Sequence, residues 1–512
     1  MGIGSRALPL VRGAAIAAVA ALAAGSAAAA PAVAPVASAV TSAVQVVPFA
    51  TGHILAAGKM SQPPTTAQCE QQFGIACYQA FQLQKAYDLA PLFAKGIEGK
   101  GETIVIVDAF GSPSIASDLK TFDSEMGLPN PPSLKVITPA GPITTTAKNC
   151  TSTFSPTGPD LCSDYFGWTD ETSLDVEWSH TMAPQANILL VETPMTETEG
   201  ITGFPQIVAA ENYVINHHLG DVISQSFGAN EQTFTSPGQI YSLRSAYFNA
   251  AQHGVTVLAA SGDQGSTDEI CDTSSDCANP NDVFCCSSTR TISWPESDPL
   301  VTSVGGTQLH LDAAGDRTAP DSVWDDLSST LGVSGPVYTS GSSGGGLSMV
   351  FSRPGFQHGV AGTVGGSRGT PDISMSAAVN GAVDFYDTSD PSTDGWAIVG
   401  GTSEASPLFS GIVALADQAA GHRLGDINPD LYALGQGKAS DGIVPISQGG
   451  NSFTFCKAAD VNSDDGSCAS SSDLVTVPGF QANGSYHDAT GWGTVDAAKF
   501  VPTLARYADH GH

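Results

Sequence analysis

Three short apolar runs, separated by helical patterns, constrain the fold of this chain more than any other feature. The runs cover residues 101–108, 185–192 and 254–261, and they are typical of strands buried on both faces. Helical patterns follow at residues 204–218 and 239–253, and glycine comes soon after each. Strands that alternate with helices predict an α/β fold, with a doubly wound, mostly parallel sheet and helices on both faces.

The charge of the chain limits the partners that it can bind. Of its 512 residues, 41 % are apolar and 13 % are charged, so a sizeable core can form. There are 19 Lys and Arg against 50 Asp and Glu, which gives a net charge of −31 at pH 7. Nucleic acid and anionic membrane surfaces repel such a chain, so we predict neither as a partner. We also expect a monomer that works in acid, where the mutual repulsion of the carboxylates falls.

The N-terminus has the pattern of an export signal. Two arginines, Arg6 and Arg12, precede an apolar run at residues 14–24, and small residues follow up to residue 30. This order predicts a signal peptide over residues 1–30 and a secreted, extracellular protein. Residues 31–68 are rich in Ala, Pro, Val and Thr and are predicted to be a linker or a short pro-segment. A single folded domain is predicted over residues 69–510.

The ten cysteines agree with export, because an even number of cysteines in an exported chain indicates disulfides. Pairing between neighbours in the sequence predicts Cys69–Cys77, Cys150–Cys162 and Cys456–Cys468. The group at residues 271–286 would form two more disulfides, and its connectivity stays open. Zinc is the alternative for that group, but it contains no Cys-x-x-Cys pair and has no nearby histidine.

Ser403 is the first candidate for a catalytic residue. It lies in the motif GGTSEASP at residues 400–407, just before an apolar helical stretch at residues 409–420. A serine on a glycine-rich turn at a helix start is accessible, and the helix dipole favours a nucleophile there. The alternative is an ordinary helix cap.

Glu171 and Asp175 form the second candidate. Positions four apart share one face of a helix, so the two carboxyl groups would lie side by side. Two adjacent carboxyl groups retain a proton over part of the acid range and can act as a general base and then as a general acid. The alternative is a solvated acidic face.

Asp263 is the third candidate, directly after the apolar run at residues 254–261. A polar side chain at this place points off the end of a strand into the crevice. A protonated aspartic acid there can donate a hydrogen bond to an oxyanion. The alternative is a glycine-aspartate turn without a function.

Together, these three motifs resemble the sedolisins, the serine-carboxyl peptidases with a subtilisin-like fold. The resemblance covers about residues 69–508 and also includes the segments at 294–307, 343–346 and 371–374. It implies a subtilisin-like fold, hydrolysis of peptide bonds in acid, and protein or peptide substrates, by endopeptidase or tripeptidyl-peptidase action. It also implies roles for seven residues. The catalytic residues would be Glu171, Asp175, Asp263 and Ser403, with Asp263 in the oxyanion hole, and the substrate-binding residues would be Ser224, Ser226 and Gly228.

The chain departs from the family pattern in two places. The family has a large N-terminal prodomain, whereas only residues 31–68 lie between the predicted signal and the peptidase region. The family also has a calcium site near the C-terminus, with an Asp-Ile or Asp-Val pair and a later Gly-x-Gly-x-Asp. Here Pro445-Ile446 replaces the first pair, and Tyr486 replaces a glycine before Asp488. We therefore predict no metal ligand, although the resemblance by itself implies calcium.

Three other functions compete with this hypothesis. A histidine triad would use Asp108, His180 and Ser403, but His180 lies at the far end of its predicted helix. Residues 341–345 fit the G-x-S-x-G pattern of an α/β-hydrolase, but they lack the strand and the following helix. An inactive scaffold that only binds peptides would have lost at least one of the four catalytic residues.

Overall fold

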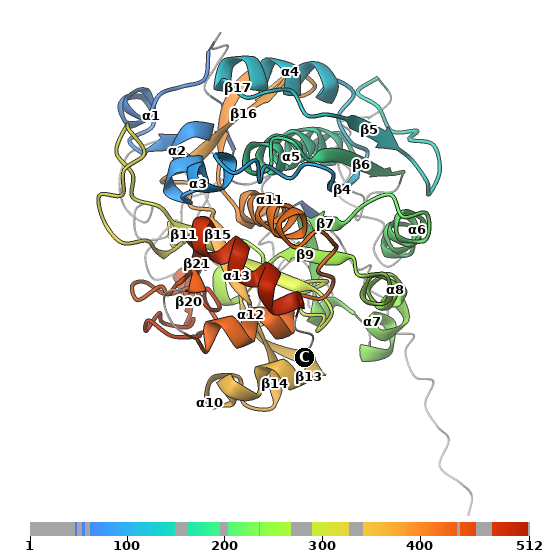
Figure 1. The fold of residues 1–512 in the computed structure, drawn as a ribbon, viewed down its shortest axis with the longest axis vertical. Coiled ribbons are helices and arrows are strands. Elements are labelled where there is room, and N and C mark those ends of the chain that lie inside the picture. The colour runs from blue at the N-terminus through green and yellow to red at the C-terminus, as the bar shows by residue number, and fades with distance from the viewer. Residues whose placement is uncertain are drawn as a thin grey trace, which may run out of the picture. The chain divides into compact units, whose positions relative to one another are not determined.

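A computed structural model gives the fold of the chain (Figure 1). It describes residues 47–48, 54–56, 62–148, 161–194, 203–234, 236–267, 289–326, 341–437, 441–456 and 474–509. The predicted signal peptide lies outside the described residues. The disulfides predicted for Cys150, for Cys468 and for residues 271–286 lie outside them as well.

An eight-stranded sheet forms the centre of the fold. Its order is β12-β11-β9-β7-β4-β6-β5, and β15 pairs with β11. All of its strand pairs are parallel except β11 with β12. In chain order, the strands are β4 (Thr103–Ala109), β5 (Leu134–Ile137), β6 (Asn187–Thr193), β7 (Val222–Gln225), β9 (Thr256–Ala260), β11 (Thr302–Gln308), β12 (Ser322–Val323) and β15 (Ile373–Ser376).

Successive residues of the central strands enter two different hydrophobic cores. In β4, Ile104 and Ile106 belong to one core, whereas Val105 and Val107 belong to the other. Side chains alternate between the two faces of a strand, and both faces are covered here, so the four consecutive residues 104–107 are all apolar. The predicted α/β class and its helices on both faces are confirmed, and the fold is subtilisin-like.

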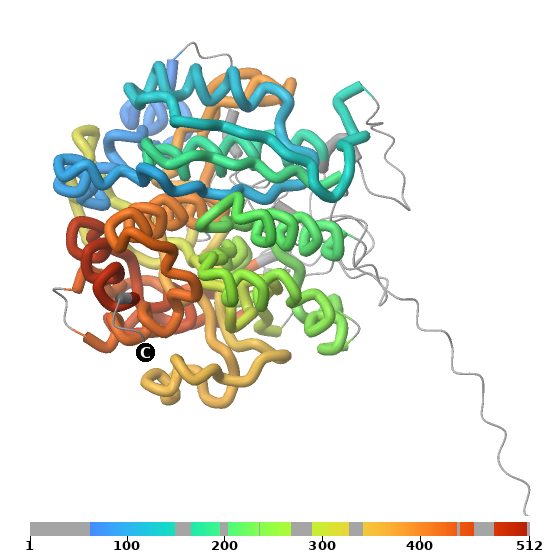
Figure 2. Tube along the Cα trace, turned by 45° about the vertical axis from the view of Figure 1, so that its right-hand side comes forward, coloured from blue at the N-terminus to red at the C-terminus, as the bar shows by residue number. Residues whose placement is uncertain are grey.

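The two faces of the sheet carry different helices (Figure 1). One face holds α5 (Leu161–Met182) and α11 (Thr402–Ala420). The C-terminal half of α5, from Leu174 on, and the buried apolar side chains of α11 belong to the core of Ile104. The other face holds α6 (Gly203–Asn216), α7 (Pro237–Leu243) and α8 (Ser245–His253). Figure 2 shows the C-terminal helix α13 (Ala497–Asp509), which packs against α11.

The single helix predicted over residues 239–253 is wrong, because the structure divides it into α7 and α8 at Arg244. The Arg244 guanidinium binds the carboxylate of Asp298 through two hydrogen bonds, of 2.5 and 2.8 Å. It also lies 4.6 Å from the centre of the Phe248 ring. Asp298 is 54 residues away in the chain, so the local pattern could not reveal this partner.

Smaller elements surround the central sheet. The short helices are α1 (Thr66–Gln72), α2 (Ala80–Ala86), α3 (Ala90–Phe93), α4 (Ile115–Met126), α10 (Ala361–Val364) and α12 (Asn428–Gly435), with 3-10 turns at η3 (Glu231–Thr233), η4 (Gly265–Thr267) and η5 (Gly355–Val360). The other strands are β1 (Val47–Pro48), β2 (Ile54–Ala56), β3 (Cys77–Tyr78), β8 (Phe227–Asn230), β10 (Ser293–Trp294), β13 (Gly346–Ser352), β14 (Ser367–Thr370), β16 (Ala382–Asp387), β17 (Gly395–Val399), β18 (Ile443–Val444), β19 (Phe453–Cys456), β20 (Leu474–Val477) and β21 (Thr494–Val495).

Three findings test what the sequence predicts about disulfides, the linker and membrane segments. The predicted Cys69–Cys77 disulfide is confirmed, and it joins α1 to β3. The region predicted to be a linker contains β1 and β2, which pair with β8 and β17. Within the described part of the chain, we find no helix with the length and apolarity needed to cross a membrane.

Candidate active site

Asp263 lies just beyond the end of β9 and is tied to the start of α11. The backbone amide and the hydroxyl of Thr402 both donate to Asp263 Oδ1, each at 2.7 Å. The Thr402 hydroxyl in turn accepts a hydrogen bond from the backbone amide of Gly262 at 3.0 Å. Asp263 is therefore more than part of a local turn, because its side chain fixes the turn that carries Ser403.

Ser403 occupies the first turn of α11. The helix begins after Gly401, so Ser403 is not the capping residue that the alternative prediction required. Gly401 has a φ of 142°, a conformation that favours glycine, and its amide donates to the carbonyl of Ala377 at 2.6 Å. The predicted accessibility of Ser403 is wrong, because its hydroxyl is buried, and no described residue hydrogen-bonds it. A hydroxyl at this position can attack a substrate that enters the site.

Glu171 and Asp175 lie one turn apart on the same face of α5. Their exposed fractions are 1 % and 0 %, so the alternative of a solvated acidic face is wrong. Burial raises the pKa of Asp175 well above its usual value, and the charges of Asp108 and Glu171 raise it further. The pair is therefore suited to retain a proton in acid.

Two serines, one on β7 and one in the link between β7 and β8, contact the two helices that carry these candidates. The Ser224 and Ser406 hydroxyls are 2.8 Å apart, and Ser406 lies one turn beyond Ser403 on α11. The Ser226 hydroxyl donates to Asp175 Oδ1 on α5 at 2.9 Å. Residues two apart on an extended chain lie on one side and roughly 7 Å from each other. The acidic pair and the first turn of α11 are thus held at the same strand end.

The helices α5 and α11 pack closely against each other at Gly411 of α11 and Met182 of α5. A Cβ atom at Gly411 on α11 would lie 2.4 Å from the Cβ atom of Met182 on α5. No larger residue fits at this crossing without a shift of one helix. The contact fixes the distance between the helix of Ser403 and the helix of Glu171.

Two further carboxyl groups at the site have raised pKa values. Burial raises the pKa of Asp263 to about 7, although its two hydrogen bonds from Thr402 lower it. Burial also raises the pKa of Asp108, near the end of β4, to about 7, and the charge of Glu192 raises it as well. Both groups are therefore neutral in acid, and a neutral aspartic acid can donate a hydrogen bond.

The three residues predicted to bind substrate lie on β7, in the link after it, and on β8. The side chains of Ser224 and Ser226 are buried and bind Ser406 and Asp175, as described above. Gly228 lies on β8, where its backbone pairs with Val47 of β1. The substrate-binding roles of Ser224, Ser226 and Gly228 stay predictions, and the side chains of the two serines contact Ser406 and Asp175.

Sequence reasoning missed the roles of Thr402 and of Asp108 beside Asp175. Thr402 precedes the expected nucleophile, and nothing in the motif reveals that its partner lies 139 residues earlier. Among the functions predicted from the sequence, Asp108 has a role only in the histidine triad. Its position at the carboxyl end of a buried strand was the available signal, because polar residues there face the crevice of an α/β fold.

The two competing nucleophile arrangements are not supported by the structure. His180 Nε2 lies 2.8 Å from the carbonyl oxygen of Pro129 and 3.2 Å from Asp123 Oδ1. His180 is nine residues after Glu171 on the same helix, which corresponds to roughly 13 Å along its axis. Within the G-x-S-x-G pattern, the Ser343 hydroxyl donates to the carbonyl of Ala489 at 2.8 Å and accepts from the amide of Gly306. Both side chains have structural partners.

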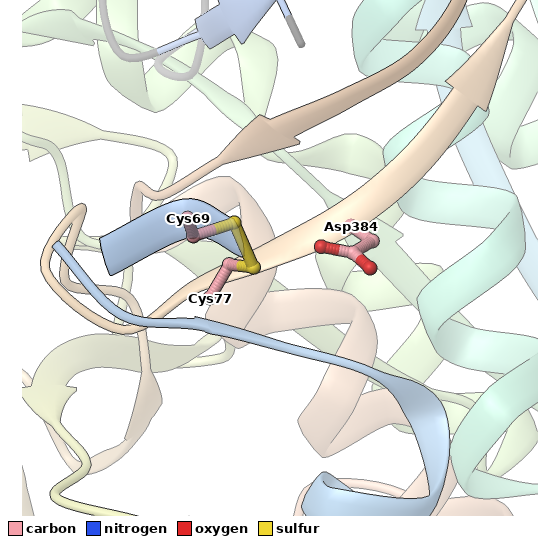
Figure 3. Close-up of side chains that lie close together, drawn as sticks. All are labelled: Cys69, Cys77 and Asp384. Carbon is pink, nitrogen blue, oxygen red and sulfur yellow. A yellow bond between two sulfur atoms is a disulfide. The ribbon is translucent and has the colours of Figure 1, made fainter. Parts of the chain in front are cut away.

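Among the described residues, one group has the geometry of metal ligands: Cys69, Cys77 and Asp384 (Figure 3). The two sulfur atoms are bonded to each other, and Asp384 points toward the disulfide (Figure 3). A cysteine binds a metal as the thiolate, and a sulfur atom in a disulfide carries no such charge. We therefore assign no metal to this group.

The residues near the family's calcium site do not fit that ion. Asp488 is buried, and burial raises its pKa to about 7, although the positive charge of Arg368 lowers it. The carbonyl oxygen of Ile446 already accepts a hydrogen bond from the amide of Gly484 at 2.9 Å. Calcium needs six or more oxygen ligands, several of them charged, and Pro445 supplies no carboxylate. No step of the proposed reaction uses this ion.

Comparison with known proteins agrees with the fold and with the motifs. The model of the Subtilase family matches residues 140–433, more than half of the chain. Kumamolisin of Bacillus sp. (strain MN-32) is 29 % identical over 348 residues, which cover 67 % of this chain and 53 % of kumamolisin. Sedolisin of Pseudomonas sp. (strain 101) is 29 % identical over 313 residues, which cover 61 % of this chain and 45 % of sedolisin.

A solved structure of Pseudomonas sedolisin, described as a serine-carboxyl proteinase, matches with a TM-score of 0.60 and 25 % identity. The match covers 85 % of this chain and 99 % of the solved one. The chain belongs to the subtilase family, and these relatives assign it to the sedolisins within that fold. It spans about half the length of the curated relatives it matches.

Proposed function

We propose that the protein is a secreted serine-carboxyl peptidase that hydrolyses peptide bonds in acid through an acyl-enzyme on Ser403. One observation carries the proposal: the buried carboxyl group of Asp263 is tied by Thr402 to the turn of Ser403. A carboxyl group with a pKa of about 7 is a hydrogen-bond donor in acid, which suits an oxyanion hole. The buried Glu171–Asp175 pair replaces the histidine of other serine peptidases.

Acylation begins when Ser403 Oγ attacks the carbonyl carbon of the scissile bond. Glu171 accepts the hydroxyl proton, and the carbonyl oxygen becomes an oxyanion. Asp263 donates a hydrogen bond to this oxyanion from the oxygen that carries its proton. The Glu171 proton then passes to the leaving amine, and the carbon–nitrogen bond breaks.

Deacylation repeats the same transfers with water. Glu171 accepts a proton from the attacking water, and the resulting acid returns it to Ser403 Oγ as the acyl group leaves. Asp175 holds Glu171 through the proton that the pair retains. The Ser226 hydroxyl orients Asp175 in turn, because it donates to the Oδ1 atom.

We also propose the domain boundaries of the protein and its location outside the cell. Residues 1–30 would direct export, residues 31–68 would precede the enzyme, and residues 69–510 would form the peptidase domain. The net charge of −31 supports an acidic place of action and disfavours nucleic acid and membrane surfaces as partners. The substrates would be proteins or peptides, and the enzyme would act as a monomer.

One experiment tests the proposed function. The purified chain is incubated with a mixture of peptides at pH 4, and the products are sequenced by mass spectrometry. We expect cleavage by the natural chain and none by Ser403→Ala. The control is Ser410→Ala, which removes a buried hydroxyl that donates to the carbonyl of Pro407 on the same helix. Equal cleavage by Ser403→Ala and Ser410→Ala would refute the proposal, and the positions of the cuts would distinguish endopeptidase from tripeptidyl action.

A further inference from the structure

The family pattern implies calcium at two segments, residues 445–446 and 484–488, and in this chain the two segments contact each other directly. Gly484 donates its backbone amide to the carbonyl oxygen of Ile446 at 2.9 Å. A Cβ atom at Gly484 would lie 3.7 Å from the Cβ atom of Ser447, which is an ordinary van der Waals distance. Protein atoms therefore join the two segments at positions that the pattern assigns to the ion.

His487 is a second partner of the Ile446 carbonyl oxygen. Its Nε2 atom lies 3.4 Å from that oxygen, and His487 is buried. A carbonyl oxygen has two lone pairs, and Gly484 and His487 together use both of them when Nε2 carries the hydrogen. A calcium ion would lie at about 2.3–2.6 Å from the same oxygen and would have to displace the imidazole. The arrangement therefore favours the histidine over the ion.

Tyr486, which replaces a glycine of the pattern, also holds the second segment. Its hydroxyl donates to the carbonyl of Gly369 on β14 at 3.0 Å. The centre of its ring lies 5.5 Å from the ring centre of Tyr432 on α12 and 5.5 Å from that of Trp492. The phenol therefore connects residues 484–488 to β14 and to α12. A glycine at this position would supply none of these contacts.

A positive charge of the chain itself acts on Asp488, the one carboxyl group of the calcium pattern that remains. The Arg368 guanidinium is buried and binds both carboxylate oxygens of Asp372, at 2.6 and 2.5 Å. Its charge also acts on the carboxyl group of Asp488. A Cβ atom at the next residue, Gly369, would lie 2.7 Å from Asp488 Oδ1, so this oxygen is close to β14. A calcium ion beside Asp488 would be repelled by the guanidinium.

We propose that the contacts of Gly484, Tyr486 and His487 replace calcium in joining these segments, so that the protein stays folded without a bound cation. The inference concerns stability and does not depend on the proposed reaction. A ligand that binds only the folded state raises Tm, and its removal lowers Tm. A chain that holds these segments with its own residues should show neither change.

The first test compares Tm in EDTA, in millimolar CaCl2 and in millimolar MgCl2 at pH 6, by circular dichroism. The full chain carries Ser403→Ala, which prevents digestion of the sample by itself. We expect the same Tm within about 1 °C in all three solutions, and no calcium on the protein after gel filtration, measured by atomic emission. A site filled at about 100 times its Kd would raise Tm by several degrees. Such a rise in CaCl2 alone, or one calcium ion retained per chain, would overturn the inference.

The second test removes one of the replacing contacts. Tyr486→Phe deletes the hydroxyl that donates to Gly369, and we expect Tm to fall by a few degrees, equally in EDTA and in CaCl2. The matched control is Tyr241→Phe, which deletes the hydroxyl of a half-exposed tyrosine that donates to the carbonyl of Val350 at 3.2 Å, and Tm should stay the same. An unchanged Tm for Tyr486→Phe, or a fall that CaCl2 reverses, would overturn the inference.

Discussion

Thr402 donates two hydrogen bonds to one oxygen of Asp263, from its backbone amide and from its hydroxyl. The proton of the neutral acid therefore belongs on the other oxygen, Oδ2. Thr402, which precedes Ser403, thus holds in place the Asp263 carboxyl group that would donate to an oxyanion. This contact ties the candidate oxyanion hole to the turn of Ser403.

The first prediction concerns the donor at position 263. Asp263→Ala removes the donor, and we expect kcat to fall by a factor on the order of 10²–10³. Asp263→Asn keeps an amide donor at every pH and an oxygen for Thr402, so its loss should be much smaller. The measurement is kcat on a peptide substrate at pH 4. Equal losses for the two variants would mean that Asp263 also transfers a proton.

The second prediction concerns the base on α5. Glu171→Gln should lower kcat by a factor of roughly 10²–10⁴ and leave KM nearly unchanged, because only proton transfer is removed. The control is Glu177→Gln on the same helix, whose carboxylate accepts a hydrogen bond from the backbone amide of Tyr386 at 3.0 Å. Similar losses in kcat for both variants would indicate a general defect of α5 rather than a missing base.

The third prediction concerns Ser226 as a positioning residue. Its hydrogen bond lowers the pKa of Asp175, so Ser226→Ala should raise that pKa further. Asp175 would then keep its proton to a higher pH, and the alkaline limb of the pH–kcat profile should move upward. Ser179→Ala is the control, since its hydroxyl donates to the backbone carbonyl of Asp175 and not to the carboxylate. A Ser226→Ala profile with an unmoved alkaline limb would contradict this role.

The fourth prediction concerns stability. The pKa values of Asp108, Asp263 and Asp488 are raised to about 7, and those of Glu211 and Glu296 to about 8. The folded state holds these protons where the unfolded chain has released them. This contribution to the free energy of unfolding is therefore complete below about pH 4 and is lost as the pH rises through 7 to 8. Urea unfolding should give a larger free energy at pH 4 than at pH 7.5.

Glu211 allows a control for this effect away from the site. It is buried on α6, and among the described residues neither of its carboxylate oxygens has a hydrogen-bond partner. Glu211→Met removes a group whose burial costs on the order of 2–4 kcal/mol at pH 7.5 and little at pH 4. The difference in unfolding free energy between the two pH values should therefore shrink. An unchanged difference would refute the assignment for this residue.

Local patterns in the sequence predicted the central fold because its physical causes are local. Strands buried on both faces need continuous apolar runs, and Ile104 and Val105 enter opposite cores as such a run requires. The candidate residues could be found for a similar reason, since each lies at a strand end or on one face of a helix. The contacts that hold Asp263 to Thr402 and Asp175 to Ser226 span long stretches of chain and leave no local pattern.

The short N-terminal strands could not be predicted. β1 and β2 contain two and three residues, too few for an alternating pattern to be recognised. Their conformation follows from the edges of β8 and β17 with which they pair. The break between α7 and α8 at Arg244 could not be predicted for a similar reason. The partner of Arg244, Asp298, lies 54 residues away in the chain and outside the helical pattern.

The pH–rate profile of the natural chain tests the central claim most directly. It is measured on a peptide substrate over the pH range in which circular dichroism shows the fold to be intact. The active form needs a proton on Asp263, with a pKa of about 7, and a proton retained by the Glu171–Asp175 pair. We predict a maximum in the acid range and a loss of activity as the pH rises through 7. A maximum at or above pH 7 would contradict the carboxylate mechanism.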